Sequence, residues 1–335
     1  MTSLTFFRKL LPVFSLLLVL LFLTGSLAEE PLSEPGLTTD MIETDAHQAI
    51  TWDLIHLVEH SPSLKTLLEQ AISQAHALNP DPMTNPVHDL ESYYAFIDRS
   101  IHAMPWEISP CGTYDSLYER IDQGMGCLYF ICDQPLEALE AEGTFHASLM
   151  YHEPFRSWFG RFLSESGRYL STEKSWCDAY YRNALANPDF HLDDGTYEDP
   201  ENWKSFNDFF ARRLRDPSVR PIAESGDDAV VVSPADAVPQ GVWRIDGESR
   251  VIAEEPAEQA GLRIKTGTLQ DVSVLLGSSA YAHAFENGTM THTFLDVNDY
   301  HRYHFPVSGT VREVLLIPQD DAPGGVITWD REEGR

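Results

Sequence analysis

Residues 229–252 read AVVVSPADAVPQGVWRIDGESRVI, and within this stretch the residue pattern of the chain changes. From about Val230 onward, short runs rich in β-branched and aromatic residues alternate with Pro, Gly, Asn and Asp, which favour turns. The runs lie at 229–232, 241–245, 249–252, 290–295, 309–317 and 325–329. This half of the chain is therefore predicted to be a mainly antiparallel β domain.

N-terminal to this stretch the apolar spacing is helical. Ser61 followed by Pro62 predicts a helix start, because serine caps the free N–H groups and proline suits the first helical position. The apolar residues that follow share one helix face: Leu64, Leu67, Leu68, Ala71, Ile72 and Ala75. A further helix is predicted around Leu90, Tyr93, Tyr94, Ile97 and Ile101, and another helical segment over 155–186, with Trp158, Phe159 and Phe162. Residues 111–147 are ambiguous. A helical N-terminal region before a β domain predicts an α+β fold.

The first 28 residues are typical of a signal peptide. Arg8 and Lys9 precede the apolar run 10–23, and 26–28 (SLA) offers small residues for cleavage. The run is shorter than the roughly 20 residues that span a membrane. We expect an exported, periplasmic or otherwise extracytoplasmic protein, with an uncleaved membrane anchor as the alternative. Residues 29–45 are predicted to be a linker.

The composition excludes one class of partner. Asp and Glu outnumber Lys and Arg by 52 to 23, which gives a formal charge of −29. Nucleic-acid binding depends on cations that neutralise phosphates, so no nucleic-acid partner is expected. Net charge alone would not bring the chain to an anionic membrane either.

The four cysteines leave two possibilities open. Cys111, Cys127, Cys132 and Cys177 could form up to two disulfides in an exported protein, or remain buried free thiols. No Cys/His cluster with zinc-ligand spacing is evident, and no metal site is predicted.

Two histidines three residues apart, His301 and His304, are the first candidates for catalysis. They lie in 299–314, DYHRYHFPVSGTVREV, before a Pro-containing turn and a glycine. Histidine titrates near neutral pH, so such a pair suits proton transfer. By itself the pair is weak evidence for catalysis, because two histidines at this spacing often have no catalytic role. A metal site would need a third ligand.

Five segments together resemble the phosphatidylserine decarboxylase family, in the family's order. The stretch 299–314 is similar to its histidine motif. The others are 206–214 (FNDFFARRL) with 220–222 (RPI), 233–236 (SPAD), 264–265 (IK) with 275–277 (LLG), and 285–289 (FENGT).

The resemblance implies a pyruvoyl-dependent carboxy-lyase. Members are made as proenzymes that cut themselves at a Gly-Ser bond, and the serine becomes a covalent pyruvoyl group. An Asp-His-Ser arrangement drives the cut, and here Asp236 matches the aspartate and His304 the histidine. The pyruvoyl carbonyl then forms a Schiff base with the substrate amine and accepts electrons as CO2 leaves. His301 matches the histidine beside the substrate, where it positions the carboxylate or handles the proton returned to Cα.

The sequence departs from the family in two places. The glycine that follows the family's aspartate is Ala237 here, and no Gly-Ser-Ser or Gly-Ser-Thr follows His304. Residues 276–279 (LGSS) precede the histidines, so Ser278 is not expected to form the pyruvoyl group. We expect the precursor serine to lie beyond residue 335, on the protein's own C-terminal α chain, and residues 1–335 alone to be inactive.

The substrate remains open between two chemistries. Phe209, Phe210, Arg212, Arg213 and Arg215 pair apolar anchors with cations, which favours a phospholipid at a membrane surface and thus phosphatidylethanolamine as product. Residues 52–106 are diffusely similar to the accessory domain of a branch that includes a fungal L-tryptophan decarboxylase, which favours a free aromatic amino acid. An inactive exported fragment or pseudoenzyme is the third hypothesis. The predicted divisions are a helical accessory region, 46–200, and an incomplete catalytic domain, 201–335.

Overall fold

The computed structural model describes most of the chain from residue 47 onward. The described residues are 47–110, 116–140, 147–227, 229–252, 262–264, 267–269, 271–277, 279–315 and 329–330. The predicted signal peptide and linker, together with Cys111, Lys265 and Ser278, lie outside them. The predicted domain division at residue 200 stays a prediction.

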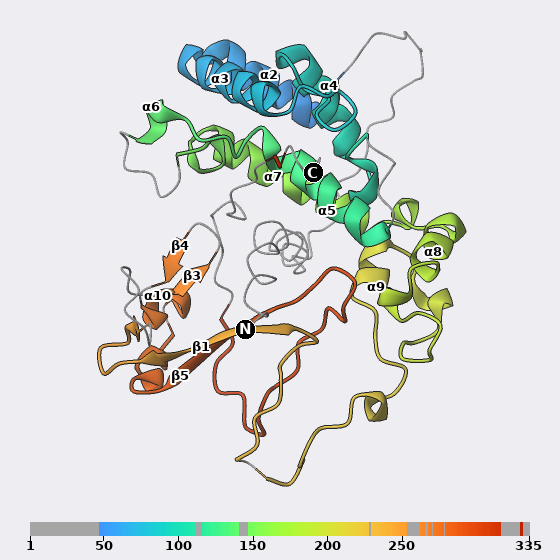
Figure 1. Cartoon of the computed structure of the whole chain (residues 1–335), viewed down its shortest axis with the longest axis vertical. Helices are drawn as coiled ribbons and strands as arrows, with labels where there is room; N and C mark the ends of the chain where they lie inside the picture. Colours follow the sequence, from blue (N-terminus) through green and yellow to red (C-terminus); the bar gives the residue numbers. More distant parts are fainter. Residues whose placement is uncertain are drawn as a thin grey trace, which may run out of the picture.

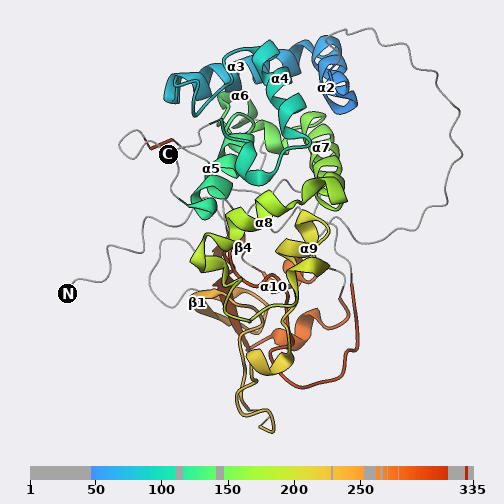
Figure 2. The same ribbon diagram turned by 90° about the vertical axis from the view of Figure 1, so that its right-hand side faces the viewer.

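The α+β prediction is confirmed: helices occupy the first part of the described chain and a small antiparallel sheet follows (Figures 1 and 2). The α-helices are α2 (Ala49–His60), α3 (Pro62–Leu78), α4 (Leu90–Ser100), α5 (Leu117–Phe130), α6 (Glu137–Glu140), α7 (Phe155–Leu170), α8 (Asp178–Leu185), α9 (Phe206–Phe210) and α10 (Val272–Leu275). Short 3-10 helices are η2 (Pro105–Glu107), η3 (Leu149–Tyr151), η4 (Glu173–Ser175), η5 (Pro188–Phe190), η6 (Pro200–Asn202), η7 (Pro217–Val219) and η8 (Ala282–Phe285). The strands are β1 (Val238–Ile245), β2 (Val251–Ile252), β3 (Leu262–Ile264), β4 (Gly267–Leu269) and β5 (Thr289–Phe294).

Helix α3 forms as its sequence predicts. The Ser61 side chain accepts a hydrogen bond from the Leu64 N–H, and Pro62 occupies the first turn. The predicted apolar face is buried along its whole length: Leu64, Leu67, Leu68, Ala71, Ile72 and Ala75. Burial of such a stripe, more than intrinsic propensity, stabilises a helix of this length.

One hydrophobic core runs through the helical region. Helices α2 and α7 lie side by side, and Trp158 of α7 donates its indole N–H to the Ile50 carbonyl of α2 at 2.8 Å. Trp158, Phe159 and Phe162 are all buried on α7, as predicted. The predicted helical segment 155–186 is two helices, α7 and α8, because Ser171 and the short η4 turn interrupt it. Val297 and Tyr300, far along the sequence, join the same core.

The main sheet has three antiparallel strands in the order β2-β1-β5 (Figure 1). It confirms the predicted runs 241–245, 249–252 and 290–295. Residues 229–232 and 309–315 contain no strand, so those two expectations are wrong over the described residues. The antiparallel pair β3-β4 was not predicted from its short sequence.

The cysteines within the described part of the chain are free thiols: Cys127, Cys132 and Cys177. Burial raises the pKa of Cys127 to about 12 and that of Cys132 well above its usual value, so both stay protonated and unreactive at neutral pH.

No helix in the described part of the chain is both long enough and apolar enough to span a bilayer.

Candidate active site

Two main-chain hydrogen bonds join segments about 70 residues apart. The Val232 N–H donates to the Pro306 carbonyl at 3.0 Å, and the His304 N–H donates to the Pro234 carbonyl at 2.8 Å. The stretch that carries Asp236 therefore runs beside the stretch that carries His304, although neither is a regular strand. These bonds bring the second and last of the five sequence motifs together.

Asp236 is held by a cation from another motif. Its carboxylate accepts a hydrogen bond from Arg220, and both side chains are partly exposed. The RPI and SPAD motifs thus meet through one ion pair. No hydrogen bond joins Asp236 to His304 in the part of the chain that the structure describes.

His304 is oriented by Tyr300. The Tyr300 hydroxyl lies 3.1 Å from His304 Nε2, and the two rings stack with centroids 5.5 Å apart. A hydroxyl at Nε2 is the contact that a histidine base makes with a nucleophile in triad chemistry. The ring is therefore positioned to exchange a proton with a hydroxyl group.

His301 lies in a drier environment than His304. Its ring stacks on Phe210 with centroids 3.8 Å apart, and its two ring nitrogens are shielded from solvent. Neither nitrogen makes a hydrogen bond of normal geometry among the described residues, although the backbone of Asp296 and Val297 interacts weakly with the ring. Burial, assisted by the nearby positive charge of Arg212, lowers the pKa of His301 to about 3. The imidazole is neutral at physiological pH, and its nitrogens can serve a bound polar group.

Arg212 fixes the loop that leads into the histidine pair. Its Nη2 donates to the carbonyls of Asn298 at 2.6 Å and Asp299 at 3.0 Å, and its guanidinium stacks on Tyr197 at 4.3 Å. Arg302 makes a second contact between the two segments, because its Nε donates a hydrogen bond to the Ala211 carbonyl at 2.7 Å. The segment 206–214 is thus the support on which the histidine motif rests.

This support corrects one interpretation of the sequence. Phe209, Phe210 and Arg212 are completely buried, so they cannot act as membrane anchors or headgroup ligands; only Arg213 and Arg215 of that cluster are exposed. Phe209 and Phe210 of α9 lie in the core, where Phe209 meets Trp176 and Trp203 and Phe210 meets His301.

A carboxyl group that sequence reasoning missed, Asp296, lies just before the motif. Burial raises the pKa of Asp296 to about 6, and the side chain of Tyr118, from α5, hydrogen-bonds to it. The N–H of Asp296 in turn donates to the Asp299 carboxylate at 3.1 Å. The only sequence signal was the run of acidic and amide residues at 296–299, which reads equally well as a turn.

The alternative serine is not placed by the structure. Ser278 lies outside the described residues, and its neighbour Ser279 donates a hydrogen bond to Glu313.

The region that holds this site is similar to known proteins. Residues 206–330 match the family profile described as phosphatidylserine decarboxylase. A relative named phosphatidylserine decarboxylase proenzyme, from Vibrio campbellii, is 36% identical over 131 residues, 39% of this chain and 41% of the relative. The proteins of the same name from Vibrio vulnificus and Salmonella agona are 32% identical over 130 residues (39% and 41%) and 36% identical over 122 residues (36% and 34%). The matched region spans about two fifths of the length of the first of these relatives.

Proposed function

Because residues 206–330 match the phosphatidylserine decarboxylase family profile, we propose that the protein decarboxylates phosphatidylserine to phosphatidylethanolamine by means of a covalent pyruvoyl group. The proposed pyruvoyl precursor is a serine on a further segment of the protein, which a self-cleavage step converts. The observation that carries the proposal is the pair of hydrogen bonds that runs the Asp236 segment beside His304.

Self-cleavage requires a base for the serine proton, and His304 is the proposed base. The Tyr300 hydroxyl already occupies a hydrogen-bonding position at its Nε2. Asp236 is the proposed partner that stabilises the imidazolium, for which it must exchange its contact with Arg220 for one with His304. Arg220 would hold the carboxylate near the motif until that exchange.

The residues present fit a small carbonyl cofactor and a carboxylate substrate. When bound, a pyruvoyl group supplies an electron-accepting carbonyl for the electron pair that departing CO2 leaves behind. The shielded ring nitrogens of His301 offer that site an N–H donor and a lone pair. Because its pKa is about 3, His301 does not hold a second proton at neutral pH, so its proposed role is to orient the substrate carboxylate.

The proposal includes export, on the strength of residues 1–28, and sequencing the N-terminus of the purified protein tests it. A free aromatic amino acid remains the alternative substrate. Burial of Phe209 and Phe210 removes one argument for a lipid, so the assay must include both substrates.

The experiment expresses the chain together with the segment that is proposed to carry the precursor serine. His304→Ala and Asp236→Ala are expected to stay uncut on denaturing gels, because each removes one member of the proposed proton-abstracting pair. His301→Ala is expected to be cut but to lose most CO2 release from phosphatidylserine vesicles. His283→Ala, an exposed histidine of the same region, is the matched control. Normal cutting of His304→Ala would disprove the assignment. CO2 release from tryptophan but not from phosphatidylserine would show that the substrate is the free aromatic amino acid and not the phospholipid.

A further inference from the structure

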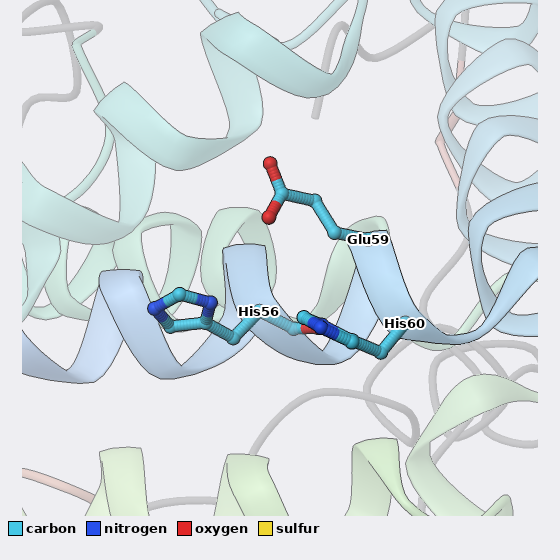
Figure 3. Close-up of side chains that lie close together, drawn as sticks. All are labelled: His56, Glu59 and His60. Carbon is cyan, nitrogen blue, oxygen red and sulfur yellow. The ribbon is translucent and has the colours of Figure 1, made fainter.

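Three potential metal ligands, His56, Glu59 and His60, gather on the last two turns of α2. One ligand atom from each lies within 4.8 Å of the other two, and all three side chains are exposed. Figure 3 shows both imidazoles on one side of the helix, with the Glu59 carboxylate extending back along it. None of the three belongs to the candidate active site, which lies between residues 206 and 306.

The spacing makes this set a chelating unit. Residues four apart stand one above the other on a helix, so His56 and His60 face the same space, and their ring centroids are 6.1 Å apart. Two imidazoles and a carboxylate form the donor set that Zn²⁺ and its neighbours in the transition series accept, with a water as fourth ligand.

His60 is already oriented for such a role. Its Nδ1 lies 2.7 Å from the His56 carbonyl oxygen, so the neutral ring donates its N–H there and carries its lone pair on Nε2. Ligand histidines usually make this second contact, because it fixes both the tautomer and the ring orientation. His60 is also the last residue of α2, where the negative end of the helix dipole favours a cation.

We propose that His56, Glu59 and His60 bind one divalent cation of the Zn²⁺ class at the surface of α2. Ligand atoms bound at about 2.1 Å in a tetrahedral shell lie roughly 3.4 Å apart. The three side chains therefore need to close by no more than about 1.4 Å, which exposed rotamers allow. The net charge of −29 raises the local concentration of cations around the chain.

Calorimetry with Zn²⁺ tests the site on the full chain after treatment with a chelator. One saturable site is expected, with affinity at least about tenfold lower in His56→Gln and in His60→Gln, since loss of even an outer-shell contact costs that much. His76→Gln is the matched control, because His76 is also exposed in the last turn of a helix, α3, but belongs to no such cluster in the described chain. Equal Zn²⁺ affinity in the parent chain and both variants, or no saturable binding at all, would overturn the proposal.

Trp52 provides a second, local readout of the same site. Its ring lies 6.3 Å from that of His56, one turn earlier on α2. Ni²⁺ bound at the site is expected to quench the part of the emission that Trp52→Phe removes, and His60→Gln is expected to abolish that quenching. Quenching that persists in His60→Gln contradicts the proposed ligand set.

Discussion

The helical region and the β-rich region differ sharply in how they bury apolar side chains. The helices share one core that includes fully buried Leu54, Trp158 and Phe162. Among the residues that the structure describes, the sheet and α10 share a separate core of three buried residues, Ile245, Val251 and Val272, with Trp243, Leu276 and Met290 packed against it. Many large apolar residues of the β-rich region are exposed instead: Val231, Val238, Val242, Ile252, Leu275, Tyr281, Phe285, Tyr303, Phe305, Val307, Val311, Val314 and Leu315.

The boundary between these two environments crosses the histidine motif. Val297 and Tyr300 belong to the helical core, whereas Phe305 is 79% exposed and Val314 is 85% exposed. His301 is thus positioned by α9 and the core behind it, and His304 by its contact with Tyr300. The helical region, rather than the sheet, therefore fixes the candidate catalytic histidines.

Arg212→Met gives the strongest test of that conclusion. The substitution keeps the apolar stem but leaves the carbonyls of Asn298 and Asp299 without their charged donor. Losing buried charge-assisted bonds of this kind costs about 3 kcal/mol. Urea unfolding measures the loss, and Arg213→Met, at an exposed site, is the control, with a change under about 0.5 kcal/mol. Equal effects of the two substitutions would show that the loop leading into the histidine pair does not depend on Arg212 for its stability.

His301→Gln tests whether the His301 ring is shielded from water, through the pH dependence of the unfolding free energy. The pKa of His301 is lowered to about 3, so between its unfolded value near 6.5 and pH 3 the unfolded chain binds a proton that the folded chain does not. Acidification from pH 7 to pH 5 should therefore cost the parent chain about 2 kcal/mol of unfolding free energy through this group alone.

The variant should lose that much less stability over the same pH range, as measured by urea unfolding at both pH values. His76→Gln, at an exposed histidine of α3, is the matched control. If His301→Gln also keeps the parent's pH dependence, the His301 ring is hydrated and is not shielded from water as the structure indicates.

Elements with a strong local pattern could be predicted from sequence. Helix α3 was predicted from its cap, its proline and its six buried apolar positions, and β1 and β5 from their β-rich runs. The runs 229–232 and 309–317 misled because a strand needs a partner. Among the described residues, 229–232 makes only isolated main-chain bonds such as Val232 to Pro306, and 309–315 pairs with no strand. Propensity cannot supply that tertiary information.

The site could be predicted only in part. Motif order singled out Asp236, His301 and His304, but it could not show that Arg220 binds Asp236 or that Arg212 is buried beneath the loop. Arg212 looked like a surface cation because arginine is rarely buried, and its stacking on Tyr197 comes from a residue 15 positions away. The His56-Glu59-His60 group was not predicted from the sequence.

The smallest effect on stability is expected where the β-rich region leaves valines exposed. Val311→Ser combined with Val314→Ser removes two side chains that are 57% and 85% exposed, so the unfolding free energy should change by less than about 0.5 kcal/mol per site. Exposed apolar patches nevertheless promote association, so light scattering should show less self-association in the double variant than in the parent. Met83→Ser, at an exposed apolar residue in the turn between α3 and α4, should leave association unchanged, because its chain neighbours Pro82 and Thr84 are not large apolar side chains. A double variant that unfolds more readily would mean that these valines are buried in solution, and the contrast between the two regions would then be smaller than the structure indicates.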